Sequence, residues 1–265
     1  MDQKIAEAAE ATTHARLEAG VLELTMSYPR RRNALAPALR EAMMAHLEAA
    51  LGKTEVRAIV LTGEGGHFCA GGDISGMQGI TGMGGRARLH WGHRMIRLLA
   101  EGEKPVIAAV EGHAAGAGIS VAAACDIVVA SRAAVFTCSF NRVGLVPDLG
   151  LAWTLQRRMG LGRAKRVMLV GAPMGAEEAA GLGLVDHLAE PGKALEEARA
   201  LARQIAARAP LSNALAKTLL NRSTGTLAES LQAEADFQGL LYTTEDFQEG
   251  RDAFLGKREP AFKGR

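Results

Sequence analysis

The sequence predicts an α/β fold with mostly parallel strands, followed by a helical C-terminal region. Apolar runs at 58–61 and 105–110 have the length and composition of buried strands, and each leads into a turn rich in glycine and alanine. A segment with helical character follows each turn. Strand, turn and helix in succession are typical of parallel α/β architecture. After Gly192 the pattern changes to helices rich in alanine and leucine.

The elements of the first half can be placed from side-chain spacing. Residues 21–26 alternate as a half-buried strand does, and leucine and methionine recur at helical spacing over 37–51, with Pro37 at a first-turn position. Residues 76–85 hold five glycines and two methionines, which predicts a mobile loop. The expected elements are strands at 21–26, 58–61, 105–110 and 126–130 and helices at 37–51 and 86–100.

The C-terminal part has a different organisation. We divide the chain into an α/β core at 1–192 and a helical region at 193–265, with no internal repeat or low-complexity linker. Such a helical region is expected to pack on a neighbouring subunit, with packing on its own core as the alternative. The expected helices lie at 193–209, 211–222, 226–241 and 244–255.

Composition excludes several classes of protein. The 265 residues are 48% hydrophobic and carry a formal net charge of +2, so no global field or basic stripe favours nucleic acid or membrane surfaces. Three cysteines are too few for a disulfide framework and fit a reducing compartment. The first residues lack the order of a signal peptide, and no apolar run reaches the roughly 20 residues that span a bilayer. We expect a soluble, cytoplasmic protein.

The two turns point to chemistry on a carbonyl group. They read HFCAGGDI at 67–74 and EGHAAGAG at 111–118. Glycine and alanine at a strand-to-helix turn allow backbone N–H groups to approach a ligand closely. Two such turns can direct two N–H donors at one point, which is the geometry of an oxyanion hole.

These motifs resemble those of the enoyl-CoA hydratase/isomerase (crotonase) superfamily. The stretch FCAGGDI at 68–74 resembles the family's F-x-A-G-x-D-[IL] turn. KPVIAAVEG at 104–112, with AGAG at 115–118 and CDI at 125–127, is similar to its K-P-V-I-A-A-V-x-G…G-G-G…C-D-I block. Further matches stand in order along nearly the whole chain at 32–35 (RNAL), 144–148 (GLVPD), 179–185 (AAGLGLV) and 254–260 (FLGKREP).

The resemblance implies a core of ββα units stacked as a superhelix, a helical C-terminal region, and homotrimers or hexamers. It implies an acyl-coenzyme A thioester as the ligand, with no cofactor beyond the coenzyme A of the substrate. The oxyanion donors would be the backbone N–H groups of Gly72 and Ala117, where Ala117 replaces the family's usual glycine. The backbone around Ala70 would contact the adenine. The candidate partners of the coenzyme A phosphates are Arg30, Arg31, Arg32 and Lys257.

The carboxylates indicate which reaction is favoured. In hydratases of the family two glutamates activate water and protonate the adjacent carbon, and Ser120 and Phe140 stand at the matching positions. Neither side chain can do this work, so hydration is disfavoured. Asp148 matches the single catalytic carboxylate of the family's isomerases, among them Δ3,Δ2-enoyl-CoA isomerases and the ring-modifying isomerase of phenylacetate breakdown. One carboxylate suffices for a 1,3-proton shift.

Three alternatives to this assignment remain open. Asp148 can instead cap the following helix, because aspartate is a favoured N-cap residue. A hydratase or another thioester reaction can recruit a different carboxylate, such as Glu64. The chain can also be a catalytically silent acyl-CoA-binding scaffold, because a fold alone does not assure a function.

The remaining candidates receive mostly structural interpretations. Asp73 and Asp126 are expected to anchor turns, His113 to be a packed histidine and Cys138 to be a buried, inert thiol. His90 and His93 lack a third metal ligand, and the glycines at 63–66 lack a dinucleotide-binding pattern. An apolar wall for a hydrophobic or aromatic acyl chain is expected from Phe140, Trp153, Met77 and Met83.

Overall fold

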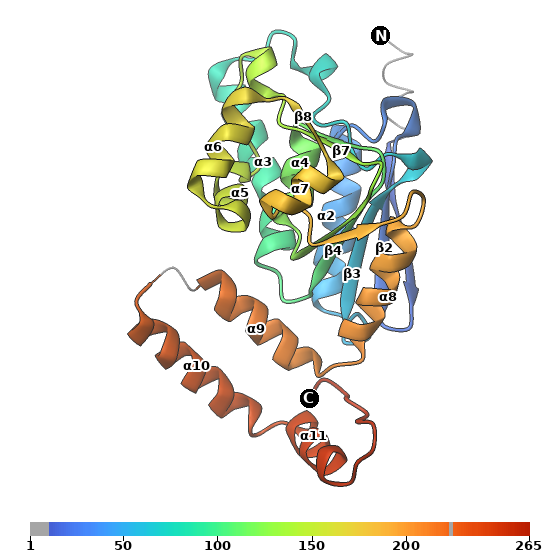
Figure 1. Ribbon diagram of the computed structural model, residues 1–265, viewed down its shortest axis with the longest axis vertical. Coiled ribbons are helices and arrows are strands. Elements are labelled where there is room, and N and C mark those ends of the chain that lie inside the picture. Colours follow the sequence, from blue (N-terminus) through green and yellow to red (C-terminus); the bar gives the residue numbers. More distant parts are fainter. Residues whose placement is uncertain (1–10, 223–224) are drawn as a thin grey trace.

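A six-stranded sheet forms the centre of the molecule in the computed structural model, which describes residues 11–222 and 225–265 (Figure 1). The strand order is β1-β2-β3-β4-β6-β9. β1 and β2 pair in antiparallel fashion, and every other neighbouring pair is parallel, as the sequence predicted. The strands are β1 (Thr12–Glu18), β2 (Val21–Ser27), β3 (Ala58–Gly63), β4 (Val106–Val110), β6 (Ile127–Ser131) and β9 (His187–Ala189).

A second, three-stranded sheet begins directly after the central strands. It contains β5 (His113–Ala115), β7 (Val135–Thr137) and β8 (Pro173–Gly175), in the order β5-β7-β8. β5 follows β4 after a turn at Glu111 and Gly112, and β7 follows β6 in the same way. The chain therefore passes repeatedly from the large sheet to the small sheet and then into a helix. This confirms the predicted crotonase-like α/β fold.

Helices cover both faces of the large sheet. On one face lie α2 (Pro37–Leu51), α3 (Gly82–Ala100) and α4 (Ala117–Ala124), whose apolar side chains join the main core. On the other face lies α8 (Ala194–Ala206) (Figure 1). Alanines recur at every fourth position of α8, at 194, 198, 202 and 206, and all are buried. Their small side chains allow α8 to lie close against Val60, Ile107 and Val129 of the sheet.

The remaining helices form two groups. α5 (Leu151–Met159) packs on α4 and on α6 (Leu161–Val170), and α7 (Ala176–Leu182) packs on β7 and β8 of the small sheet. Beyond the large sheet, an arm is formed by α9 (Pro210–Arg222), α10 (Leu227–Leu241) and α11 (Glu245–Leu255) (Figure 1). The predicted C-terminal helices are therefore confirmed. Among the described residues, none of the helices has the length and apolar character needed to cross a membrane.

The packing of α8 bears on the predicted division of the chain. The boundary at Gly192 was placed before α8, yet α8 belongs to the sheet layers and only the helices after it extend from the core. The division into 1–192 and 193–265 stays a prediction, and this packing favours a later start for the separate helical region.

The predicted loop at 76–85 is wrong in its second half. A short 3-10 helix, η3 (Ile74–Met77), overlaps the start of the predicted loop. α3 begins at Gly82, within its second half. Thr81 caps α3, because its Oγ1 accepts a hydrogen bond from the backbone N–H of Gly84 at 3.1 Å. This cap offsets the weak helix propensity of the glycines in the first turn, a contribution that composition alone underestimates.

Candidate active site

The two glycine-rich turns lie against each other and are joined by backbone hydrogen bonds. The N–H groups of Phe68 and Cys69 donate to the carbonyls of Glu111 and His113, at 2.8 and 2.9 Å. In the reverse direction, the N–H of Ala115 donates to the carbonyl of Cys69 at 2.9 Å. These bonds fix the position of one turn relative to the other, so groups at their tips form one rigid site.

Two glycines allow this close approach. A Cβ atom at Gly118 would lie 2.3 Å from the carbonyl oxygen of Cys69, and one at Gly71 would lie 2.7 Å from that of Ala115. Gly71 also has φ +107°, a backbone conformation that strongly favours glycine. Any larger residue at these two positions would force the turns apart.

The turns present two backbone donors, as the sequence predicted. Gly72 follows the contact at Gly71, and Ala117 is the first residue of α4, so no earlier helical carbonyl can accept its N–H. Gly116 turns the chain into α4 with φ +50° and ψ −122°. In the part of the chain that the structure describes, neither N–H donates a hydrogen bond to another residue. Both residues line a cavity of about 310 Å³.

Asp148 lines the same cavity from the loop before α5. Its Oδ1 is buried and has no hydrogen-bond partner. Burial raises the pKa of the Asp148 carboxyl above its ordinary value, while the guanidinium groups of Arg88 and Arg40 oppose this rise. The adjacent Leu149 is buried and has φ +49°, an unfavourable conformation for a leucine.

The structure does not support the alternative role of Asp148 as a helix cap. α5 has Gly150 as its N-cap residue, without any side-chain cap. The Asp148 side chain faces the cavity rather than the first turn of α5, and only its backbone carbonyl accepts from the helix, from the N–H of Leu151 at 3.1 Å. The carboxyl group is thus left available for chemistry.

The other candidate acid–base positions are unsuited. Ser120 is fully buried in α4, outside the cavity wall, and its hydroxyl lies 3.5 Å from the carbonyl of Gly116. Phe140 lines the cavity and is 6% exposed. Glu64 is exposed and does not line the cavity, so the structure does not bring it to the site. Asp73 does line the cavity, which the expectation of a purely structural aspartate missed.

Two arginines in the cavity wall were not identified from the sequence. Arg40 stands on the apolar face of α2 with Met43, Met44 and Leu47, and it is 5% exposed. Arg88 stands one turn before Gly92 on the buried face of α3 and is partly buried. A charged residue on an apolar helical face was the available signal in both cases. Burial and the nearby Arg88 lower the pKa of Arg40 to about 10, so it remains charged at neutral pH.

We compared the whole chain with known proteins to learn which family it belongs to. The family model described as Enoyl-CoA hydratase/isomerase matches residues 16–265. The chain belongs to this family. The enzymes of the family act on acyl-CoA thioesters, and the cavity that Gly72 and Ala117 line is called the acyl-CoA cavity below.

Individual relatives are similar to this chain over nearly the full length of both proteins. The 1,2-epoxyphenylacetyl-CoA isomerase of Escherichia coli (strain K12) is 36% identical over 258 residues, covering 94% of this chain and 97% of its own. The 2,3-dehydroadipyl-CoA hydratase of the same organism is 38% identical over 250 residues, covering 92% and 96%. The crystal structure of an enoyl-CoA hydratase from Polaromonas sp. JS666 is 41% identical with a TM-score of 0.90, covering 95% and 99%.

The predicted coenzyme A contacts are only partly brought together in the single chain. Ala70 is exposed beside the oxyanion turn, and its N–H donates to the carbonyl of Arg32 at 2.9 Å. Arg31 lines the cavity, and Arg30 precedes it in the exposed 3-10 helix η1 (Pro29–Arg31). Lys257 follows α11 in the arm and does not line the cavity. The roles of these residues toward coenzyme A stay predictions.

The predicted apolar wall is correct for two of its four members. Phe140 and Met77 line the acyl-CoA cavity, whereas Met83 is 77% exposed in the first turn of α3. Trp153 lines a different cavity, described next. The reason is helical geometry, because α5 buries Leu151, Thr154 and Leu155 and thereby turns Trp153 to another side.

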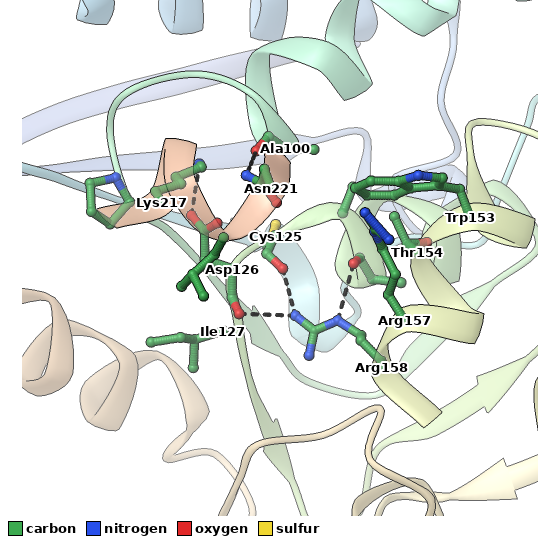
Figure 2. Close-up of a pocket in the computed structure, with 14 residues that line it drawn as sticks. Ala100, Cys125, Asp126, Ile127, Trp153, Thr154, Arg157, Arg158, Lys217 and Asn221 are labelled. Carbon is green, nitrogen blue, oxygen red and sulfur yellow. Dashed lines mark hydrogen bonds and ion pairs between the residues drawn. The ribbon is translucent and has the colours of Figure 1, made fainter. Parts of the chain in front are cut away.

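Figure 2 shows this second cavity, of about 450 Å³, between α4, α5 and α9. Its most buried cations already have partners in the protein. Lys217 forms an ion pair with Asp126 at 2.8 Å, and Arg158 donates to the carbonyls of Ala123 and Cys125 at 3.1 and 2.5 Å. The buried charges of this cavity hold α5 and α9 on the end of α4.

The other interpretations of single residues are structural. Asp126 accepts a hydrogen bond from the Val106 N–H at 2.7 Å, which confirms it as an anchor. His113 stacks on His67 with 5.2 Å between ring centroids, as expected of a packed histidine. Burial raises the pKa of the Cys138 thiol to about 11. Within residues 11–222 and 225–265, no group of three or more metal-binding side chains is found.

Proposed function

We propose that the protein is an enoyl-CoA isomerase, which shifts a double bond from the 3-enoyl to the 2-enoyl position of an acyl-CoA thioester. The reaction would be a 1,3-proton transfer through a thioester enolate, with Asp148 as the acid–base group. It requires no cofactor beyond the coenzyme A of the substrate. The name of one relative, 1,2-epoxyphenylacetyl-CoA isomerase, supports isomerisation of an acyl-CoA within this branch of the family.

The proposed mechanism uses three groups that line one cavity. The thioester oxygen would accept hydrogen bonds from the N–H groups of Gly72 and Ala117, which polarise the carbonyl. The Asp148 carboxylate would then take a proton from the carbon next to the carbonyl, and the resulting enolate oxygen would remain on the two donors. The same carboxyl group would return the proton two carbons further along the chain, so the substrate neither gains nor loses atoms.

The observation that carries this proposal is the environment of Asp148. Its Oδ1 is buried without a partner and its carboxyl pKa is raised, which suits a group that must both accept and donate a proton near neutral pH. Phe140, which the resemblance places at the position of a hydratase glutamate, also lines the cavity, and its side chain cannot exchange a proton.

Hydration of a 2-enoyl-CoA is the second candidate. Two observations favour it: Asp73 provides a second carboxylate in the cavity wall, and several relatives are named enoyl-CoA hydratases. The pair of Asp73 and Asp148 would then have to replace the two family glutamates, one activating water and the other protonating the adjacent carbon. A catalytically silent acyl-CoA-binding scaffold remains the third alternative.

Product analysis separates these functions. We would incubate purified protein with 3-enoyl-CoA and 2-enoyl-CoA of several chain lengths and resolve the products by chromatography and mass. Conversion of 3-enoyl to 2-enoyl at unchanged mass is the expected result. A gain of one water on the 2-enoyl substrate, lost in Asp73→Asn, would establish the hydratase instead. Binding of both thioesters without turnover would indicate a scaffold.

We further propose that the protein forms a homotrimer or a hexamer through its helical arm. The arm exposes large apolar side chains that a monomer would leave in water, among them Leu227 at 75%, Leu231 at 53% and Phe254 at 84% exposed. Light scattering coupled to size-exclusion chromatography should give three or six times the mass of 27.9 kDa. A monomer at micromolar concentration would contradict this assembly.

A further inference from the structure

The acyl-CoA cavity contains two arginines whose charges have no partner in the part of the chain that the structure describes. Arg40 is 5% exposed, its Nε is buried without a hydrogen bond, and its guanidinium only stacks over the ring of Trp91 at 5.0 Å. Arg88 is partly buried. Among the described residues, neither guanidinium forms a hydrogen bond or an ion pair.

Such an arrangement is costly unless a ligand completes it. Moving a charged group out of water requires compensation by hydrogen bonds or an opposite charge, and buried arginines are almost always paired. Arg40 keeps its charge at neutral pH, because burial lowers its pKa only to about 10. Its stacking on Trp91 compensates part of this cost at most, since a cation–π contact satisfies no N–H donor.

The positions of the two guanidinium groups relate them to the reacting part of the substrate. Nη2 of Arg88 lies 3.9 Å from the point where a Cβ of Gly72 would stand, so it is beside an oxyanion donor. Nη1 of Arg40 lies 3.4 Å from the corresponding point at Gly92, where Leu149 also packs. Both groups act electrostatically on Asp148. Arg88 is therefore next to the oxyanion hole, and both cations line the cavity that also contains the proposed base.

We propose that Arg40 and Arg88 form an oxygen-binding subsite for the acyl group of the substrate. The acyl chain would carry a hydrogen-bond-accepting oxygen beyond the thioester, either a carboxylate or a neutral oxygen, and this oxygen would receive the free N–H donors. A guanidinium is suited to such recognition because it offers several donors in a fixed plane. The inference rests on the proposed function in one respect: it places the thioester carbonyl at Gly72 and Ala117.

An alternative role is that the arginines only neutralise the carboxylates of the cavity. The wall does contain Asp73 and Asp148, and Arg31 adds a third cation. Neither Arg40 nor Arg88, however, is in ion-pair contact with either carboxylate, although a neutralising pair would gain most by direct contact. The N–H donors of both guanidinium groups therefore stay available to a polar group of the ligand.

The test compares saturated acyl-CoA thioesters, which bind but cannot isomerise. Three series of four, six and eight carbons would end in a methyl, a hydroxyl or a carboxyl group, and their dissociation constants would be measured by isothermal titration calorimetry. A hydrogen bond to a charged group contributes about 1.5–3 kcal/mol, so the favoured oxygen-bearing ligand should bind at least about tenfold more tightly than its methyl analogue. The preferred end group identifies the oxygen as carboxylate or neutral.

The variants Arg40→Met and Arg88→Met connect the preference to these side chains. Each variant should reduce the preference for the oxygen-bearing ligand over its methyl analogue to less than about threefold. Arg94→Met should leave this preference unchanged, because Arg94 pairs with Glu48 on the exposed side of α3. Circular dichroism and methyl-ended ligands verify folding, and Arg40→Lys replaces Arg40→Met if the latter does not fold. Equal or tighter binding of the methyl-ended ligands, or a preference that survives in both arginine variants, would overturn the subsite. Because these ligands do not react, failure here is distinct from failure of the isomerase assay.

Discussion

Asp148 is subject to opposing influences on its acidity. Burial raises the pKa of its carboxyl group, and the positive charges of Arg88 and Arg40 lower it. The net direction is upward, so the ionised form that must accept the proton becomes populated at a higher pH than for an ordinary aspartate. The pKa of this single carboxyl group is thereby shifted toward neutral pH. Such a shift suits a group that must first accept a proton and then return it.

The pH dependence of the reaction should reflect this balance. The acid limb of kcat/KM should have an apparent pKa above the ordinary aspartate value of about 3.9, because activity is lost as Asp148 becomes protonated. Arg88→Met removes a charge that favours the ionised form, so the limb should move to higher pH. Profiles of the wild type, Arg88→Met and the control Arg94→Met check this. A limb that stays in place or moves to lower pH in Arg88→Met would refute it.

Motif spacing was sufficient to predict part of the site at this scale. Gly72, Ala117 and Asp148 stand in recognisable local patterns, and the structure brings all three to one cavity. Arg40 and Arg88 belong to no motif, because their role depends on how two helices pack over the turns. A charge on an apolar helical face indicates only that something unusual is buried, and tertiary structure is needed to show what it faces.

At the scale of elements, the close contact between the two turns determines whether the donors converge. Gly118 has no left-handed backbone that would itself require glycine, so its identity is explained by space alone. The contact also brings together Gly72 and Ala117, two donors that lie far apart in the sequence. Phe68 and Cys69 of the first turn form backbone hydrogen bonds with Glu111, His113 and Ala115, and these bonds hold the two donors in place.

Gly118→Ala should therefore damage both stability and activity. The added Cβ would meet the Cys69 carbonyl at 2.3 Å and separate the turns. Overpacking of this kind costs about 1–3 kcal/mol, and a displaced donor should lower kcat/KM more than about tenfold. Gly181→Ala in α7 is the matched control, because nothing lies within 4 Å of its Cβ position. Urea unfolding and kinetics measure both effects, and equal behaviour of the two variants would contradict the steric explanation.

The elements themselves were predictable where a side-chain pattern extends over several residues. α2 was expected at 37–51 and is found at Pro37–Leu51, since its leucines and methionines follow one helical face. β5, β7, β8 and β9 were missed because each has only three residues, too few for any period to show. Their pairing depends on how the chain crosses between the two sheets. A local sequence pattern does not contain this information.

At the scale of the whole molecule, buried Lys217 joins the arm to the core. Its Nζ donates to the carbonyls of Leu99 and Lys104 at 2.7 and 3.0 Å and pairs with Asp126 (Figure 2). These partners lie at the end of α3 and at the strands β4 and β6, so one ammonium group connects α9 with several segments of the core. The helical arm is thus held to the core by polar contacts of α9.

Lys217→Met should weaken this connection. Removing one partner of a buried pair costs about 3–5 kcal/mol, and we expect the lower end because the Asp126 side chain is 26% exposed. Lys165→Met on the exposed face of α6 should have no measurable effect. Hydrogen exchange resolved by segment should show faster exchange in α9 together with the lower unfolding free energy. Unchanged protection of α9 would show that contacts other than those of Lys217 hold the arm on the core.

The assembly is the property least accessible from the single chain. Alanine- and leucine-rich segments predicted the helices of the arm, but not whether their apolar faces meet the same chain or another. In the structure, α10 has no buried residue, while Leu227, Leu231 and Leu240 are exposed. The proposed contribution of Lys257 to the phosphates of coenzyme A depends on the same question, because Lys257 lies in the arm.

The identity of the acid–base group is the central claim, and Asp148→Asn tests it most directly. The amide keeps the shape of the side chain but cannot take up the proton, so isomerisation of 3-enoyl-CoA should fall by about 10²–10⁴-fold. Saturated acyl-CoA should still bind within a few-fold of wild type, since the oxyanion donors are untouched. Isomerisation at the wild-type rate in Asp148→Asn, with the protein folded and the ligand bound, would contradict the assignment of Asp148.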